Sequence, residues 1–352
     1  MYSHSVPTGL QVQTEAPLAP LTTFAVGGAA RYFAVAHSEA QVATAVAWAE
    51  ERSLRLFILG GGSNVLVRDA GFDGLVLKIG LLGVEACEDG CFEVGAGEIW
   101  DEFVERVTRQ EMAGVECLAG IPGSVGGTPV QNVGAYGQEV GETIEWVRAF
   151  DRNSRGWVRL EKEACRFRYR QSLFNSDEPE RYIVTRVRFR LRPGGKPNLG
   201  YADLQRRLGG RPGLTLAAVA SAVREIRREK GMLLVEGDPD CRSAGSFFKN
   251  PVVGLERLEA ISAAAGVTPG MVPGWPAGAG LIKIPAAWLL EQTGFVKGFG
   301  DGPARISSRH TLALTNHGGA TCADIERLQG QIVERVRDRF GITLEREPVL
   351  LG

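Results

Sequence analysis

The sequence contains little of what several large enzyme classes require. Only four histidines occur in 352 residues and no GxSxG motif is present, so no Ser-His-Asp triad for acyl transfer is identifiable. No Lys-Ser/Thr pair follows a glycine loop, and no GxGxxG opens a helix. These absences argue against a serine hydrolase, a P-loop nucleotidase and a Rossmann dehydrogenase.

The chain also lacks strong net charge, long apolar runs and a metal-binding cluster. The formal net charge is −1, so no global field favours nucleic acid or an anionic membrane. No apolar run approaches membrane-spanning length, and no signal-peptide pattern is present. The six cysteines are scattered, and no histidine near Cys87 and Cys91 completes a zinc site. We therefore expect a cytoplasmic enzyme with reduced thiols.

Glycine and proline, by contrast, are frequent and mark the predicted divisions of the chain. Residues 1–20 are polar and contain proline, which predicts a loosely held N-terminal arm. The stretch RPGGKP at 192–197 is the best domain boundary, because the pattern beyond it becomes more helical. The predicted division is an arm over 1–20, a first domain over 21–195 with halves 21–80 and 81–195, and a second domain over 196–352.

Apolar periodicity predicts the main elements. An amphipathic helix over 39–52 precedes a buried strand over 54–59, and a half-buried antiparallel strand covers 182–191. Thr321 and Asp324 resemble a capping box in front of an amphipathic helix. Further predicted elements are a strand over 75–79, a strand and then a turn over 92–97, a helix over 100–108, a hairpin over 144–160, and a short helix from Pro285 to Gly294.

The chain is organised around LRLFILGGGSNVLV, residues 54–67. Gly60, Gly61 and Gly62 have no Cβ, so the turn can take positive φ and approach a ligand closely. Successive N–H groups in such a turn form an anion-binding nest, to which Ser63 and Asn64 add side-chain donors. We interpret this stretch as a pyrophosphate-binding turn; the alternative is a glycine-rich hairpin.

A second glycine-rich stretch covers residues 114–137, GVECLAGIPGSVGGTPVQNVGAYG. Its seven glycines and two prolines exclude a regular helix or strand, yet it is too apolar for a solvated linker. Long irregular loops of this kind are usually functional. Gln131, Asn132 and the backbone offer donors and acceptors for a flat heterocycle, whereas the alternative is an interdomain connector.

Three polar clusters remain as candidates for chemistry. The first is CRFRYRQSLF, in which Arg166, Arg168 and Arg170 share one face of a predicted strand. Arginine is always charged and binds a carboxylate bidentately, so this face can stabilise an anion. The alternative is a solvated strand face.

The other two clusters carry a hydroxyl and two carboxylates. SAGSFFKNP predicts a tight turn that exposes Ser246, which is either a proton donor or a structural turn residue. In LEREPVLLG, Glu345 and Glu347 are two residues apart and share a strand face. Solvated carboxylates are the default interpretation of that pair.

Taken together, these motifs resemble one family, the UDP-N-acetylenolpyruvoylglucosamine reductases (MurB), flavoenzymes that complete UDP-N-acetylmuramate. The resemblance runs nearly end to end, and the motifs occur in the right order. It implies an α+β chain with an FAD-binding fold of the vanillyl-alcohol-oxidase (PCMH) type and a C-terminal α+β substrate domain whose last strand returns to the active site. The matching motifs are TTFAVGG, GGGSNVLV, AGIPGSVGGTPVQNVGAYG, FRYRQS, LGYADL, AGSFFKNP and LEREPV.

The resemblance implies non-covalent FAD, with NADPH as the hydride donor. It implies that the glycine turn binds the FAD pyrophosphate and that the 114–137 loop lines the isoalloxazine. The implied cofactor-binding residues are Gly60, Gly61, Gly62, Ser63, Asn64, Gly120, Ile121, Pro122, Gly123, Ser124, Gly126, Gly127, Gln131, Asn132, Gly134 and Ala135.

The resemblance also implies catalytic roles for Arg170, Ser246 and Glu347. An enol ether conjugated to a carboxylate accepts hydride at its β carbon, and Arg with a carboxylic acid can stabilise the charge that develops. A serine then delivers a proton to the α carbon. The implied substrate-binding residues are Tyr201, the gating tyrosine of the type I form, with Lys230, Asn250 and Tyr169.

The chain departs from the family pattern in two places. GMLLVEGDPDCR lengthens the stretch between Lys230 and Ser246, which weakens the assignment of Lys230. Pro348 stands where valine is commoner, so the choice between Glu345 and Glu347 stays open. We expect a monomer that acts on NADPH and the enolpyruvyl sugar nucleotide and binds neither nucleic acid nor membrane.

Two other functions compete with this one. A flavin oxidase of the same fold would act on a sugar or alcohol, and many such oxidases tether FAD through His or Cys. No histidine lies near the glycine turn or the 114–137 loop in the sequence, but Cys117 is a candidate tether. A non-catalytic flavin- or nucleotide-binding module would not need Arg170, Ser246 and Glu347 together.

Overall fold

The structure, a computed structural model, describes residues 3–5 and 9–352. Its internal contacts divide the chain into two compact units. Unit 1 comprises Met1–Pro17, Ala29–Ser63 and Phe72–Glu229. Unit 2 comprises Leu18–Gly28, Asn64–Gly71 and Lys230–Gly352. Two short segments from the N-terminal third of the chain therefore belong to the unit that the C-terminal third forms.

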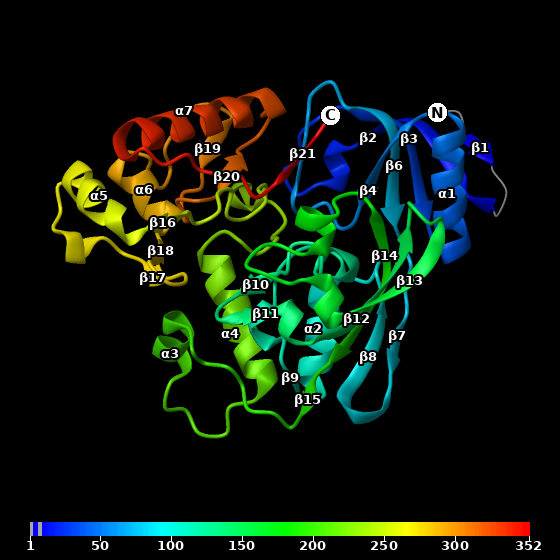
Figure 1. Ribbon diagram of the computed structural model, residues 1–352, viewed down its shortest axis with the longest axis horizontal. Helices are drawn as coiled ribbons and strands as arrows, with labels where there is room; N and C mark the ends of the chain where they lie inside the picture. Colours follow the sequence, from blue (N-terminus) through cyan, green and yellow to red (C-terminus); the bar gives the residue numbers. More distant parts are fainter. Residues whose placement is uncertain (1–2, 6–8) are drawn as a thin grey trace. The chain divides into compact units, whose positions relative to one another are not determined.

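The first sheet of unit 1 has the strand order β1-β2-β3-β6-β4 (Figure 1). β3 and β4 run parallel to β6, and β2 runs antiparallel to β3. Helix α1 (Glu39–Glu51) begins after Ser38, whose side chain accepts a hydrogen bond from the Gln41 amide, and buries the predicted apolar face. The strands are β1 (Ser3–Ser5), β2 (Gln11–Pro17), β3 (Ala29–Ala36), β4 (Arg55–Leu59) and β6 (Phe72–Ile79).

The second sheet of unit 1 is antiparallel and has the order β13-β12-β14-β8-β7. On β14, buried Val187 and Phe189 alternate with arginines, as the sequence predicts for a half-buried strand. Helix α2 (Trp100–Arg109) packs Trp100 and Phe103 against Phe189, with ring centroids 5.8 and 5.1 Å away. The strands are β7 (Val84–Ala86), β8 (Cys91–Gly95), β12 (Ile144–Asp151), β13 (Gly156–Glu161) and β14 (Tyr182–Arg190).

Two further helices and two short ladders complete the regular structure of unit 1. Helices α3 (Ala202–Leu208) and α4 (Leu216–Glu229) place Leu204, Leu208, Val219 and Val223 in the core of this unit. The ladders pair β9 (Met112–Ala113) with β15 (Arg192–Pro193), and β10 (Gly134–Ala135) with β11 (Gln138–Glu139).

Unit 2 is built on helix α7 (Cys322–Phe340), whose buried stripe runs from Ile325 to Phe340. Both hydrogen bonds of the predicted Thr321–Asp324 capping box are present, which confirms that prediction. α5 (Leu258–Ala265) and α6 (Ala286–Gln292) are shorter. The strands are β5 (Val65–Val67) with β21 (Val349–Leu351), β16 (Val252–Gly254) with β18 (Leu281–Lys283) and β17 (Trp275–Pro276), and β19 (Ala304–Ile306) with β20 (Leu314–Asn316).

The prediction of a loosely held N-terminal arm is wrong for residues 10–17. Gln11–Pro17 forms β2, and Leu10 and Val12 are fully buried in the core of unit 1. Leu10, Val12 and Ala16 lie on alternate positions, which is the period of a strand, and the polar residues between them face outward. Residues 1–2 and 6–8 of the predicted arm lie outside the described residues.

The predicted domain boundary at 195/196 also differs from the structure. The division falls between Glu229 and Lys230, because the apolar stripe of α4 packs into unit 1. Arg192 and Pro193 pair with β9 inside that unit. The glycines and prolines at 192–197 therefore form a turn within unit 1. Gly and Pro indicate a turn, whether or not a domain ends at that turn.

Candidate active site

The glycine turn joins strands of two different sheets. β4 ends at Leu59 in the first sheet of unit 1, whereas β5 pairs in parallel with β21 in unit 2. The hairpin alternative is therefore excluded. Gly62 has a φ of +68°, the left-handed conformation that the glycine run predicted.

The turn lies against the second glycine-rich stretch, within unit 1. A Cβ placed on Gly61 would lie 2.5 Å from Gly123 Cα and 2.8 Å from Ser124 N, distances that real Cβ atoms do not reach. One placed on Gly60 would lie 2.8 Å from Ser124 Oγ, and one on Gly123 would lie 2.9 Å from Ser63 Oγ. The backbone of the glycine turn at 60–63 therefore lies in direct contact with the backbone of the 114–137 loop. We call Gly60–Ser63 with Gly123 and Ser124 the glycine cradle.

Ser124 supplies an unused polar atom in the glycine cradle. Its side chain is buried, and its Oγ has no hydrogen-bond partner among the described residues. A buried polar group without a partner costs about 1–3 kcal/mol. This hydroxyl, the close backbone approach and the N–H groups of the turn together fit an oxygen-rich anionic group such as a pyrophosphate.

Charged side chains fix the start of the second stretch. Asp101, in the first turn of α2, accepts a 2.6 Å hydrogen bond from the Gly120 amide. The same carboxylate accepts a 2.8 Å hydrogen bond from Arg224 Nη2. Arg227, which is buried, donates from Nε to the Gly120 carbonyl at 2.9 Å. Burial lowers the pKa of the Arg227 guanidinium. Both backbone polar groups of Gly120 are therefore held by side chains.

Asn132, predicted to contact the cofactor, uses its side chain within unit 1. It donates to Glu139 Oε2 at 2.7 Å and to the Arg168 carbonyl at 3.1 Å, and it accepts from the Gly141 amide at 2.9 Å. Its φ is +43°, a conformation that Asn tolerates. The side-chain amide therefore holds the loop in its fold, and the Asn132 backbone amide also bonds within it, to the Pro129 carbonyl at 3.4 Å.

The predicted strand over the three arginines is wrong. Arg166 and Arg170 have φ values of +50° and +58°, and the left-handed conformation breaks the alternation that the sequence suggests. Arg166 and Arg168 bind Asp177 at 3.3 and 2.6 Å. Arg170 instead lies beside Gly134, where a Cβ would come within 3.3 Å of its Nη1. Of the three, Arg170 is the one whose side chain lies at the loop predicted to line the isoalloxazine, whereas Arg168 meets that loop through its carbonyl.

Tyr169 and Tyr201 are both partly exposed in unit 1. The Arg170 guanidinium lies 5.5 Å from the centre of the Tyr169 ring. Tyr201, just before α3, meets the ring of Tyr136 edge-on, with centroids 5.2 Å apart. Tyr136 belongs to the AYG of the 114–137 loop, so the predicted gating tyrosine is packed on that loop.

In unit 2 the structure brings Ser246 and Glu347 into neighbouring chain segments. The Glu347 amide donates to the Phe247 carbonyl at 2.8 Å, and the Lys249 amide donates to the Glu345 carbonyl at 2.9 Å. The Glu345 side chain is exposed and pairs with Lys249 Nζ at 3.4 Å, whereas Glu347 is half-buried. The two glutamates therefore have different environments, and only Glu347 is bonded to the residue next to Ser246.

Three further predicted residues, Asn64, Lys230 and Asn250, belong to unit 2. Asn64 donates from its side chain to the Glu347 carbonyl at 3.3 Å, which ties the end of the glycine turn to Glu347. Asn250 caps α6, because its Oδ1 accepts from the Ala286 amide at 2.9 Å. Lys230 is the first residue of the C-terminal segment of unit 2. Arg170 belongs to unit 1, so the predicted catalytic residues are divided between the units.

Sequence reasoning missed a pair of residues on the small sheet of unit 2. Trp275 on β17 is 53% exposed, and the Lys283 ammonium on β18 lies 5.9 Å from its ring centre. A large exposed aromatic side chain beside a cation is a common feature of ligand sites. The sequence feature that could have indicated this pair is a tryptophan in the turn-rich stretch GWPAGAG.

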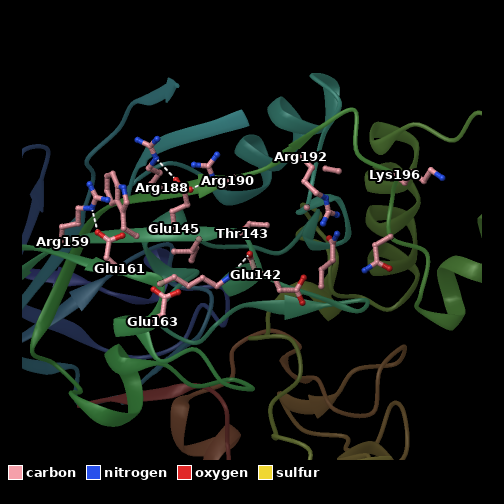
Figure 2. A pocket seen from close by; sticks show the side chains of 17 residues that line it. Glu142, Thr143, Glu145, Arg159, Glu161, Glu163, Arg188, Arg190, Arg192 and Lys196 are labelled. Carbon is pink, nitrogen blue, oxygen red and sulfur yellow. Dashed lines mark hydrogen bonds and ion pairs between the residues drawn. The ribbon is translucent and has the colours of Figure 1, made fainter. Parts of the chain in front are cut away.

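A charged cleft of about 930 Å³ opens on unit 1 but contains none of the predicted site residues (Figure 2). Figure 2 shows Arg159 and Glu161 at one end and Arg192 and Lys196 at the other. Arg159 binds Glu161 at 2.7 Å, and Glu145 binds Arg188 at 2.9 Å. Since these charges largely neutralise one another on the face of a sheet, we do not assign the active site to this cleft.

Comparison with known proteins first defines the class. A profile described as FAD binding domain matches residues 30–157. The fold is similar to that of a crystal structure of UDP-N-acetylenolpyruvylglucosamine reductase from Thermus caldophilus, with a TM-score of 0.67 and 24% identity over 97% of this chain and 100% of that chain. The chain thus has the FAD-binding fold that the resemblance implied. With the reductases described next, which are 49% and 47% identical to it, this fold makes it an FAD-dependent oxidoreductase. No helix among the described residues is long and apolar enough to cross a membrane.

The particular family follows from closer relatives. A reductase of Streptomyces coelicolor is 49% identical over 346 residues, which cover 96% of this chain and 90% of that protein. One from Streptomyces avermitilis is 47% identical, covering 96% and 94%. A profile of the UDP-N-acetylenolpyruvoylglucosamine reductase C-terminal domain matches residues 238–351. The chain belongs to the UDP-N-acetylenolpyruvoylglucosamine reductase family, which confirms the resemblance.

Proposed function

We propose that the chain catalyses the NADPH-dependent reduction of enolpyruvyl-UDP-N-acetylglucosamine to UDP-N-acetylmuramate, a step in peptidoglycan precursor synthesis. The observation that carries this proposal is the adjacency of Ser246 and Glu347. They are far apart in the sequence, yet Glu347 is hydrogen-bonded to the residue after Ser246. A hydroxyl and a carboxylate on adjacent chain segments suit proton delivery with charge stabilisation.

The glycine cradle is the proposed site of the FAD pyrophosphate. The absence of Cβ atoms at Gly60, Gly61 and Gly123 and the unpaired Ser124 hydroxyl support this assignment. The backbone from Gly120 to Ala135 is the proposed lining of the isoalloxazine, held by Arg227 and Asp101. When bound, FAD supplies the hydride; the protein supplies orientation and charge.

The chain's own residues then have separate tasks. Arg170 and Glu347 stabilise the charge that develops on the substrate carboxylate, and Ser246 delivers a proton to the α carbon. The greater burial of Glu347 and its bond to the Ser246 segment favour it over Glu345. Lys230, Asn250, Tyr169 and Tyr201 bind the sugar nucleotide. Trp275 and Lys283 offer a stacking face and a cation to its nucleotide end.

The alternative functions receive less support. A covalent flavin oxidase needs an accessible tether, but Cys117 is fully buried in the core of unit 1, and burial raises the pKa of its thiol to about 12. A thiol of that kind is poorly reactive. A binding module would have no use for a Ser246–Glu347 pair. A cytoplasmic monomer stays our prediction for location and assembly.

Two half-reactions test the proposed function. Anaerobic NADPH should bleach the flavin of the holoenzyme, and the enolpyruvyl sugar nucleotide should then restore its absorbance with formation of UDP-N-acetylmuramate. Crotonate-like simple enoates serve as a negative control for nucleotide recognition. Bleaching without restoration by the sugar nucleotide would overturn the proposed substrate and leave only the flavoenzyme class.

A further inference from the structure

The segment between Lys230 and Ser246 carries a proposed functional residue at each end, yet it has little regular structure. Its one regular element is the short 3₁₀ helix η9 (Pro239–Cys241). Long irregular segments of compact domains are normally functional or mobile. Fixed positions for Lys230 and Ser246 therefore require anchors within this segment.

Asp240 is the central anchor. It is 4% exposed, and its carboxylate accepts hydrogen bonds from Ser308 N at 3.1 Å, Ser308 Oγ at 2.6 Å and Arg309 Nε at 2.9 Å. Arg309 also binds Asp238, which in turn caps η9 by accepting from the Asp240 amide. Burial opposes the charged carboxylate of Asp240, but its hydrogen bonds from Ser308 and Arg309 bring its pKa below the usual value.

The Asp240–Arg309 ion pair lies in close contact with Gly231, the residue that follows Lys230. Gly231 has a φ of +66°, and a Cβ placed on it would lie 2.9 Å from Asp240 Cβ and 3.1 Å from Arg309 Nε. Only glycine combines this conformation with so close an approach. The start of the segment is therefore held against its middle.

The loop that carries Arg309 also holds the residue that follows Ser246. The Phe247 amide donates to the Leu312 carbonyl at 2.8 Å, and the Phe247 side chain is fully buried. Within the loop, the amides of Arg309 and His310 donate to Ser307 Oγ at 3.1 and 3.2 Å. One short loop, 307–312, thus contacts the neighbours of both Lys230 and Ser246.

We propose that Asp240 and Arg309 are positioning residues that set Lys230 and Ser246 for the reaction with the enolpyruvyl sugar nucleotide. This inference rests on the proposed function. Both residues act through Gly231 and the 307–312 loop. A planar guanidinium that bonds a buried carboxylate fixes direction as well as distance, which suits an anchor for two separate functional groups.

The first test separates the two half-reactions in the holoenzyme. In Arg309→Lys and Asp240→Asn, NADPH should reduce the flavin within about twofold of the wild-type rate, because no proposed cofactor residue is touched. Reoxidation at saturating sugar nucleotide should fall by about a hundredfold, since small misplacements of reacting groups have effects of that size. The apparent substrate affinity should fall as well, through Lys230.

Arg257→Lys is the matched control. Arg257 also lies in unit 2 and binds two backbone carbonyls, those of Phe340 and Gly341, at 3.2 and 3.1 Å. Its variant should leave both half-reactions unchanged. Equal loss of reduction and reoxidation in the Arg309 and Asp240 variants would show a purely structural role and overturn the proposal, as would reoxidation at the wild-type rate.

A second variant and a second readout keep the outcomes distinct. Gly231→Ala disturbs the same contact from the other side and should reproduce the selective loss of reoxidation; wild-type behaviour of this variant would also contradict the proposal.

Hydrogen exchange of amides in 231–249 should accelerate in Arg309→Lys but not in Arg257→Lys. If the wild-type enzyme itself fails to reoxidise with the sugar nucleotide, the proposed function fails. Unchanged exchange refutes the anchor independently of activity.

Discussion

The main-chain amide of Glu347 donates a 2.8 Å hydrogen bond to the carbonyl of Phe247, the residue next to Ser246. The adjoining bridge between Phe248 and Arg346 makes this a short antiparallel pairing. Side chains alternate along such a pairing, so Glu345 and Glu347 lie on the same side of their segment, with Glu347 bonded to Phe247 and Glu345 bonded to Lys249. The backbone register therefore distinguishes the two glutamates, in addition to their different side-chain burial.

We predict that FAD is bound without a covalent link. Cys117, the candidate tether, is fully buried within the core of unit 1 and donates its thiol to the Asn198 carbonyl. Acid precipitation of the purified protein should release all yellow colour into the supernatant. Colour retained in the pellet would favour the oxidase alternative.

Gly61→Ala should weaken FAD binding by about ten- to hundredfold, because overpacking of about 1–3 kcal/mol corresponds to that range. The new Cβ would meet the Gly123 backbone, which cannot rotate away. Fluorescence titration of apoprotein with FAD measures the change. Gly330→Ala is the control, since Gly330 lies inside α7 and a new Cβ there would meet no atom within 4 Å apart from the nearby backbone of its own helix. That variant should bind FAD normally and unfold at a slightly higher temperature. FAD affinity unchanged in Gly61→Ala would remove the glycine cradle as the pyrophosphate site.

Tyr201→Phe and Tyr201→Ala should both weaken sugar-nucleotide binding and leave NADPH reduction of the flavin almost intact. Phe keeps the edge-on contact with Tyr136 and loses only the hydroxyl, whereas Ala loses both. If the hydroxyl contacts the diphosphate, the two variants should be similarly impaired. Tyr182→Phe, whose ring packs against Phe174 in unit 1, serves as the control. Equal damage to both half-reactions would argue against a gating role.

The capping box of α7 should make stability depend on acid pH. Hydrogen bonds from the Thr321 amide and hydroxyl, with Arg327 beside them, lower the pKa of Asp324 to about 2. Because the native pKa lies below that of a free Asp, about 3.9, this contribution is complete above pH 4 and is lost as pH falls towards 2.

Asp324→Asn should therefore lower the free energy of unfolding by about 1 kcal/mol at pH 7, with a smaller difference from wild type near pH 2.5. Thermal unfolding followed by circular dichroism measures both values. Asp338→Asn, in the last turn of the same helix, removes a carboxylate that opposes the helix dipole and should not destabilise the protein. A deficit in Asp324→Asn that is constant over this pH range would contradict the assignment.

Much of the local structure was predictable because local patterns determine it. The apolar stripe of α1, the alternation on β14 and the Thr321–Asp324 cap all follow from short-range periodicity or capping chemistry. The sequence predicts the two glycine-rich stretches, but it does not predict the close approach of Gly61 to Gly123. Nothing in the spacing of those stretches indicates that they meet.

The wrong predictions, and the contacts that the sequence does not predict, have physical reasons as well. The alternation of Arg166, Arg168 and Arg170 suggests a strand, but left-handed backbone at two of these residues separates Arg170 from the others. Asp240 and Arg309 are 69 residues apart, so their ion pair depends on tertiary packing that no local pattern encodes. The β5–β21 pairing likewise assigns residues 64–71 to unit 2 through a contact between distant segments.

Ser246 is either a proton donor or a structural turn residue, and one set of variants separates the two roles. A serine hydroxyl is a weak acid in water, so it donates a proton only where the site stabilises the resulting alkoxide. Ser246→Ala should leave NADPH reduction of the flavin near normal, but flavin reoxidation by the enolpyruvyl sugar nucleotide should fall by about a hundredfold or more. Ser246→Cys should retain part of the rate, because a thiol also donates a proton. Ser243→Ala is the matched control, since Ser243 Oγ accepts a 3.2 Å bond from the Gly245 amide in the same turn. Stopped-flow reoxidation of the reduced enzyme measures all three variants. If Ser246→Ala reoxidises at the wild-type rate and still forms product, Ser246 is a structural turn residue, and the proton comes from Glu347 or water.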